Sequence, residues 1–240
     1  MNVKEQLFEL YSSKWENYCT EIKPIIENDS YLVKPTNPLL LNPDTEYENA
    51  DIRVMIFGQE TNDWEGIFNP YATSDKTINR LLDVYNGFYN LEGYKKHGGH
   101  FWNGFRLFKG ILTEKYPNKK VSFLWNNIIK IGKANTMNCP PEYIYEVERN
   151  YFSVVCEEIE ILKPHIVLFL TGPNYDKYIK DRLHLSEIVQ FIQFDKKKIA
   201  KVELPNIDYG YRTYHPNYLY RQGKLAIEAY FATIVNEINV

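Results

Sequence analysis

The sequence predicts an α/β protein: a three-layer α/β/α sandwich whose central, mainly parallel sheet has four core strands. Two observations predict this fold. Short apolar runs that stop at glycine or at polar residues are typical of strands buried on both faces. These runs alternate along the chain with segments whose apolar residues recur every three or four positions, as in amphipathic helices. Such alternation favours a parallel sheet with helices on both sides.

The first half of the chain begins with a helix and then reaches the first strand. Apolar residues from Leu7 to Ile22 recur at helical spacing, and a proline-containing loop over Asn28–Ala50 follows them. Ile52–Phe57 is a short apolar run that stops at Gly58, as a buried strand does. In order, we expect a helix over Val3–Ile26, a strand over Ile52–Phe57, a helix through Ile78–Tyr85 capped by Thr73 or Ser74, and a helix over Phe101–Tyr116.

The second half repeats the strand–loop–helix pattern. Pro141 suits the first turn of a helix, where its missing amide hydrogen has no cost. In order, we expect a strand over Val121–Trp125, a loop over Asn126–Pro140, a helix over Pro141–Leu162, a strand over His165–Leu170, a helix through Tyr178 and Leu183, short strands over Ile188–Phe194 and Ile199–Leu204 with Lys196–Lys198 in the turn, a last core strand over Arg212–Tyr214, and a closing helix over Tyr218–Ile238.

Length and composition favour one globular domain over residues 1–240, with a helix and loop in residues 1–50 and the core in residues 51–240. No stretch approaches the roughly 20 apolar residues of a membrane span, so we expect a cytoplasmic protein that does not bind membranes. We also expect a monomer. The three cysteines lie far apart, which argues against a disulfide framework, a zinc knuckle or an iron–sulfur cluster.

Charge is unevenly distributed along the chain. The net charge is -3, but residues 86–135 hold nine basic residues against Glu92 and Glu114, a net of +7. This stretch is the candidate footprint for nucleic acid. Ordinary solvated helix faces would give the same count, so both interpretations stay open.

In parallel sheets, ligands bind beyond the carboxyl ends of the strands, so the residues that follow each strand are the candidate site. Four short polar motifs occupy these positions. They are Gly58-Gln59-Glu60, Asn126-Asn127, Thr171-Gly172-Pro173-Asn174 and His215-Pro216-Asn217. We therefore expect Gly58, Asn126, Thr171 and His215 to face one shared cleft.

This ordered set resembles the uracil-DNA glycosylase superfamily, over about residues 52–224. In that family similar motifs surround a base flipped out of DNA. The resemblance implies a DNA glycosylase that hydrolyses the N-glycosidic bond of a damaged or modified, uracil-like base. It also implies single- or double-stranded DNA as the partner and no metal or redox cofactor.

Two residues carry the implied chemistry. Glu60 takes the place of the family carboxylate that orients water and stabilises the sugar cation, with Asp63 as a competitor. His215 matches the histidine that donates a hydrogen bond to the departing base. A capping role for Glu60, or an ordinary satisfied histidine at 215, is the alternative interpretation of each.

The resemblance also assigns residues to substrate binding. Asn126 matches the asparagine that reads the base edge, Phe68 (or Trp64 or Tyr71) is the candidate stacking ring, and Leu219 is the candidate wedge beside Arg221, which could meet a phosphate. The remaining candidate contacts are Gly58, Gln59, Gly172 and Asn217.

The motifs depart from the family pattern at several positions. Glu60 replaces an aspartate, Thr61-Asn62-Asp63 replaces Pro-Tyr-His, and Asn217-Tyr218 replaces Ser-Pro. The base specificity therefore does not carry over. Two rival functions stay open: a catalytically silent member that binds nucleic acid or protein, and a hydrolase of free nucleosides or nucleotides. His97 and His100 lack an acidic partner nearby in the sequence and are weak candidates for a metal site.

Overall fold

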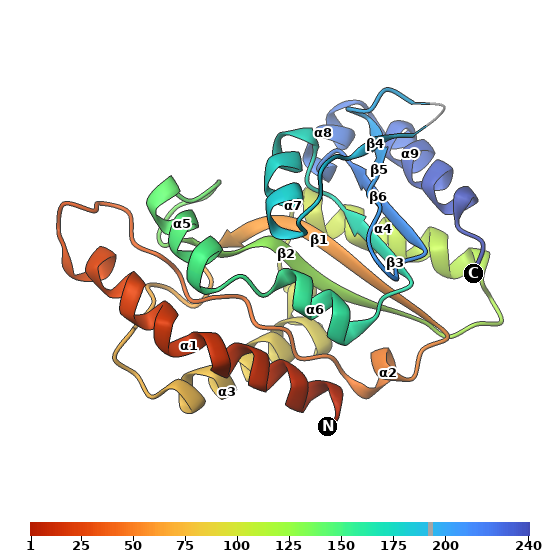
Figure 1. The fold of residues 1–240 in the computed structure, drawn as a ribbon. Helices are drawn as coiled ribbons and strands as arrows, with labels where there is room; N and C mark the ends of the chain where they lie inside the picture. The colour runs from red at the N-terminus through yellow and green to blue at the C-terminus, as the bar shows by residue number, and fades with distance from the viewer. Residues whose placement is uncertain (192–193) are drawn as a thin grey trace. The chain divides into compact units, whose positions relative to one another are not determined.

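The computed structural model describes residues 1–191 and 194–240, which form an α/β fold with a six-stranded mixed sheet (Figure 1). The strands are β1 (Ile52–Asn62), β2 (Val121–Lys133), β3 (Ile166–Phe169), β4 (Val189–Gln190), β5 (Ile199–Lys201) and β6 (Tyr209–Thr213). The α-helices are α1 (Val3–Glu27), α2 (Thr45–Glu48), α3 (Ser74–Tyr85), α4 (His100–Lys115), α5 (Glu142–Tyr151), α6 (Val155–Leu162), α7 (Asp176–Arg182), α8 (Pro216–Arg221) and α9 (Lys224–Glu237).

The strand order in the sheet is β2-β1-β3-β6-β5-β4. The pairs β1–β3 and β3–β6 are parallel, with Val54 opposite Ile166 and Ile166 opposite Tyr209. Strand β5 pairs antiparallel with β6, and β4 pairs antiparallel with β5. The predicted α/β class is confirmed, but the sheet has six strands and is mixed. Part of the strand expected over Ile188–Phe194 falls on residues 192 and 193, outside the described residues.

The first two strands extend well past their predicted ends. We expected β1 to stop at Phe57 and β2 at Trp125, but they continue to Asn62 and Lys133. In β2 the polar residues Asn126 and Asn127 are buried within the strand. Near the far ends, a side chain on Gly132 would overlap the carbonyl oxygen of Thr61, so only glycine allows this close approach. The polar residues that marked the ends of these two strands in the sequence therefore lie inside them.

The chain divides into two compact units, each assembled from three segments. Unit 1 comprises Met1–Pro43, Gln59–Leu91 and Asn127–Leu162. In this unit α1 lies beside α3, α5 and α6 (Figure 1). An aromatic cluster packs against α1: the ring of Tyr18 in α1 lies 4.9 Å from that of Phe68, which follows β1, and 5.1 Å from that of Phe152, which follows α5.

Unit 2 comprises Asp44–Gly58, Glu92–Asn126 and Lys163–Val240. In this unit α4 packs against α8 and α9, with the rings of Phe108 and Phe231 5.5 Å apart (Figure 1). The end of α9 is fixed to the end of α4, because the Tyr116 hydroxyl donates to the carbonyl of Ile238 at 2.7 Å. The expectation of a single domain stays a prediction.

Two predicted helices are each divided in two. The helix expected over residues 141–162 breaks after Tyr151 into α5 and α6, and the closing helix breaks at Gly223, whose φ of 106° is a conformation that favours glycine. Thr73 takes the cap position of α3 but makes no side-chain capping bond. Among the described residues, no helix combines the length and the apolar character that crossing a membrane requires.

Candidate functional site

His215 lies in unit 2, between the end of β6 at Thr213 and the start of α8 at Pro216. Its side chain caps α8, because Nδ1 accepts a hydrogen bond of 3.1 Å from the amide of Asn217. The neighbouring Thr171–Asn174 turn is attached to the same strand end: the amide of Gly172 donates to the carbonyl of Thr213 at 2.9 Å. Two of the predicted motifs, the one at Gly172 and the one at His215, therefore do come together.

The first turns of α4 cover the His215 turn. The ring of Phe101 lies 6.0 Å from the imidazole of His215 at an angle of 25°, a stacked arrangement. The ring of His100 lies 5.2 Å from that of Tyr220. Further along the helix, Gly104 lies directly against Pro216, where a larger residue would clash. Helix α4 and α8 thus hold the imidazole between them.

His215 is a neutral hydrogen-bond donor at neutral pH. Burial lowers the pKa of His215 from 6.5 to about 4, and the charge of His100 acts in the same direction. A neutral imidazole carries one N–H group. Because Nδ1 accepts the bond from Asn217, the proton lies on Nε2. The imidazole therefore carries an uncharged Nε2–H group.

The two candidate carboxylates lie in unit 1. Glu60 is half-buried within β1, one residue from the buried Thr61, and not in a loop after the strand as expected. Gln59 beside it is also half-buried. Asp63 directly follows β1, is exposed, and accepts a hydrogen bond of 3.0 Å from the amide of Asn135. Glu60 and His215 belong to different units, and their shared cleft stays a prediction.

Asn126 does not stand at a strand end. It lies within β2 and is completely buried, with its amide nitrogen 3.8 Å from the sulfur of Met55. The expectation that Asn126 reads a base edge placed it in a loop, and that placement is wrong. The apolar run in the sequence ends at Trp125, but β2 continues because polar residues in it are buried rather than solvated. Gly58, expected just after β1, is likewise inside its strand.

Two aromatic or apolar candidates are core residues. Phe68 is buried in the aromatic cluster of unit 1, so it presents no open face on which a base could stack. Leu219 is fully buried in α8, so its side chain is not placed to enter a base stack. Beside it, Tyr218 is 43% exposed and stacks on Tyr214 with ring centroids 4.1 Å apart. Arg221, at the end of α8, is exposed.

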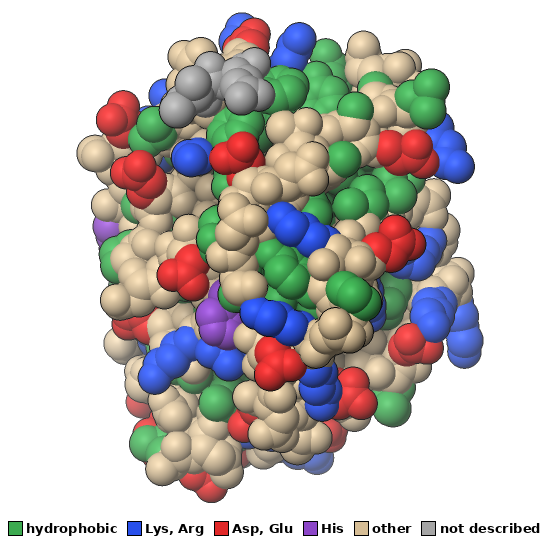
Figure 2. Space-filling view, turned by 90° about the vertical axis from the view of Figure 1, so that its right-hand side faces the viewer, with side chains coloured by type: hydrophobic (Ala, Val, Ile, Leu, Met, Phe, Trp, Pro, Cys, Tyr) green, Lys and Arg blue, Asp and Glu red, His purple; other side chains and the backbone are tan. Residues whose placement is uncertain are grey.

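Not every basic residue counted in residues 86–135 reaches the surface. Lys130, counted in it, is completely buried and forms an ion pair of 2.8 Å with Glu158. On the face drawn in Figure 2, basic and acidic side chains are interspersed, with no broad area of one sign. The net charge of +7 counted along residues 86–135 therefore overstates the positive charge that this stretch exposes.

Sequence reasoning missed two groups of residues near His215. His100 and Phe101 begin α4; the sequence suggested His100 only as a weak candidate for a metal site and Phe101 only as the start of a helix. A second group surrounds Arg212, which is completely buried and binds Asp176 through two hydrogen bonds of 2.8 and 2.9 Å. In the sequence, the only signal for this second group was an arginine in the short strand just before the His215 motif.

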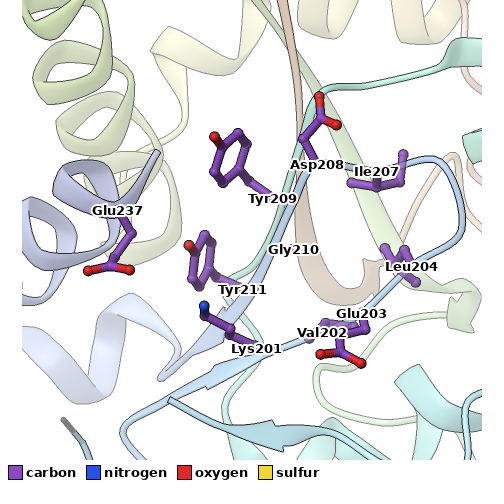
Figure 3. A pocket seen from close by; sticks show the side chains of 10 residues that line it. All are labelled: Lys201, Val202, Glu203, Leu204, Ile207, Asp208, Tyr209, Gly210, Tyr211 and Glu237. Atoms are coloured by element: carbon purple, nitrogen blue, oxygen red, sulfur yellow. The ribbon is translucent and has the colours of Figure 1, made fainter. Parts of the chain in front are cut away.

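A pocket of about 280 Å³ lies in unit 2 near the start of β6, at the opposite end of that strand from His215 (Figure 3). None of the predicted site residues lines it. The residues that do are Lys201, Val202, Glu203, Leu204, Ile207, Asp208, Tyr209, Gly210, Tyr211 and Glu237. Burial and the nearby Glu237 charge raise the pKa of Tyr211 to about 12, so its hydroxyl stays protonated. Three carboxylates against one lysine make this pocket unsuited to an anionic ligand.

Within residues 1–191 and 194–240, no group of three or more histidine, cysteine, aspartate or glutamate side chains could hold a metal ion. No protein-family model matches the chain, and none of the curated proteins is significantly similar to it.

Proposed function

We propose that the chain is a divergent member of the uracil-DNA glycosylase superfamily that hydrolyses the N-glycosidic bond of a damaged or modified, uracil-like base flipped from DNA. The three-layer arrangement around four core strands is part of this proposal. One observation carries it: the neutral, largely buried His215 at the end of β6, whose Nδ1 is bound to a backbone amide and whose proton lies on Nε2.

This histidine suits a reaction in which the leaving group becomes an anion. When an N-glycosidic bond breaks, negative charge develops on the departing base and positive charge on the sugar. A fixed Nε2–H group binds the anionic base more strongly than the neutral base, and so favours the transition state over the bound substrate. The capping bond to Asn217 keeps the imidazole in one orientation, so no reorganisation is needed during the reaction.

Glu60 supplies the opposite charge in this proposal. A carboxylate near the sugar stabilises the oxocarbenium-like state and orients the attacking water. Asp63 is the alternative for this role, although its carboxylate already accepts the amide of Asn135.

The test compares two substitutions of His215 that differ in whether they retain the cap of α8. His215→Asn retains a side-chain oxygen that can cap α8 but removes the imidazole donor, whereas His215→Ala removes both. Each protein is incubated in single turnover with oligonucleotides that carry uracil or other modified bases, and abasic sites are detected by alkaline cleavage. We expect both variants to lose about a hundredfold or more in rate, the scale of one preorganised electrostatic group. Glu60→Gln should lose a similar factor.

The control is the exposed His184, whose replacement by alanine should leave the excision rate unchanged. Should His215→Asn excise the base at the parent rate while His215→Ala does not, His215 only caps α8 and the proposed role is wrong. Activity retained in Glu60→Gln but lost in Asp63→Asn would transfer the carboxylate role to Asp63.

A further inference from the structure

A turn of three consecutive lysines is held rigidly beside the end of β6. Arg212, the penultimate residue of β6, donates to the carbonyl of Lys196 at 2.8 Å and to that of Lys197 at 3.0 Å. The hydroxyl of Thr213, the last residue of β6, donates to the carbonyl of Lys198 at 2.9 Å. Three successive backbone carbonyls of the turn are therefore bound by two successive residues of one strand.

The side chain of Arg212, which binds the turn, is itself held in one position. The guanidinium of Arg212 forms a bidentate ion pair with Asp176 at the start of α7, the geometry in which arginine is most rigid. On the turn, the carboxylate of Asp195 accepts the amide of Lys197 at 2.9 Å. Burying a guanidinium costs several kcal/mol in lost hydration unless its donors are satisfied. Here they bind the turn and Asp176, so the arginine specifies the conformation of the Lys196–Lys198 turn.

The side chains of this turn are open to solvent, because residues 195–198 are all exposed. In the described part of the chain, none of the three ammonium groups forms an ion pair. Asp195 is the acidic residue nearest in sequence, and its carboxylate is engaged by the backbone amide of Lys197. The turn thus presents three ammonium groups without an ion-pair partner among the described residues, next to the single carboxylate of Asp195, a net charge of +2 over residues 195–198.

The turn and His215 lie at the same end of the sheet. Strand β5 begins at Ile199, directly after the turn, and Ile199 lies opposite Thr213, two residues before His215. Both belong to unit 2. A strand bound by the turn would therefore lie at the same end of the sheet as the imidazole that we propose contacts the departing base.

We propose that the Lys196–Lys198 turn binds the phosphate backbone of the polynucleotide that carries the target base. This inference rests on the proposed function and names its substrate class: a nucleic acid strand rather than a free nucleoside. A single phosphate would need one or two of the ammonium groups. Three adjacent lysines with long flexible side chains on a fixed turn suit several successive phosphates of one strand.

The test measures the binding of a fluorescent single-stranded oligodeoxynucleotide with unmodified bases, so it needs no excision. The triple variant Lys196→Gln/Lys197→Gln/Lys198→Gln is compared with the parent across roughly 50 to 200 mM salt. If each lysine contacts one phosphate, the slope of log K against log salt should fall by roughly 2, since each contact to a single strand contributes about 0.7. The affinity at low salt should fall as well.

Two controls isolate the position and the charge. Lys4→Gln/Lys76→Gln/Lys224→Gln removes the same charge from three other exposed sites and should leave the slope nearly unchanged. Lys196→Arg/Lys197→Arg/Lys198→Arg keeps the charge and should bind like the parent.

An equal slope in the parent and the turn variant overturns the inference, as does an equal loss in the turn variant and the distant variant. The His215→Asn protein should bind the same strand with the parent slope. A loss of excision in that protein with unchanged binding concerns the proposed function alone, so the two proposals fail separately.

Discussion

The buried ion pair in unit 1 gives the sharpest test of the packing. The ammonium of Lys130 lies 2.8 and 2.9 Å from the two carboxylate oxygens of Glu158, and both side chains are 0% exposed. The hydroxyl of Tyr11 also donates to Glu158 at 2.7 Å and accepts the amide of Leu41 at 2.9 Å. Burial lowers the pKa of Lys130, and the nearby Glu158 charge opposes that change.

Lys130→Met removes one charge and leaves the other buried. Because the substitution removes the ammonium that pairs with the buried carboxylate of Glu158, we expect the free energy of unfolding to fall by about 3 to 5 kcal/mol. In Lys130→Met/Glu158→Leu both charges are gone, and most of that loss should be recovered, since apolar replacement of a buried pair is often neutral. Urea unfolding measures both. Hydrogen exchange of the β2 and α6 amides tells whether the loss is local to unit 1.

The matched control is Lys197→Met, which alters an exposed lysine and should change the stability by less than about 0.5 kcal/mol. The reasoning is refuted if Lys130→Met costs no more than that control. A double variant that is less stable than Lys130→Met would also contradict the prediction. The attraction between Lys130 and Glu158 would then exceed the free energy that burying the two charges costs.

Other expected outcomes concern His215 and the glycines. The pKa of His215 is about 4 in the folded protein and 6.5 in the unfolded chain, so between these pH values the unfolded chain binds one more proton. The free energy of unfolding should therefore fall by up to about 3 kcal/mol as the pH drops from about 6.5 to 4. His215→Asn should abolish that part of the pH dependence, and an imidazole NMR signal that titrates near 6.5 would contradict it. Gly132→Ala should lower the free energy of unfolding, measured by thermal unfolding, by about 1 to 3 kcal/mol or more, because the new methyl group meets the Thr61 carbonyl. Gly87→Ala, which meets nothing within 4 Å, should not destabilise.

Helices with a clear apolar stripe were predicted well. The helix expected over residues 3–26 forms over Val3–Glu27, and that expected over residues 101–116 forms over His100–Lys115. Local spacing decides such elements, because one face of each helix is buried and the other is solvated. The break between α5 and α6 follows no proline or glycine, so no local signal marked it.

Strand ends were harder to predict because they depend on tertiary contacts. Polar residues normally end a buried strand, since an unsatisfied polar group inside the core is costly. In β2, Lys130 breaks that expectation because Glu158 reaches it from α6, 28 positions further along the chain. A partner so distant leaves no trace in the local pattern. The same limit explains Leu219 and Phe68, whose burial depends on packing rather than on their neighbours in sequence.

His215 is the candidate for which the structural and the catalytic roles do not compete. An imidazole has two nitrogens, and the cap of α8 uses Nδ1. That bond fixes the proton on Nε2, so the contact that begins the helix also prepares the donor. Burial against Phe101 then keeps the ring uncharged, so in the proposed reaction the donor would add no fixed positive charge and would act mainly on the charge that develops on the base. A serine or an aspartate could cap the helix equally well but would lack an imidazole N–H group. The helix cap alone therefore does not require histidine at position 215, whereas the proposed contact to the departing base uses its Nε2–H group.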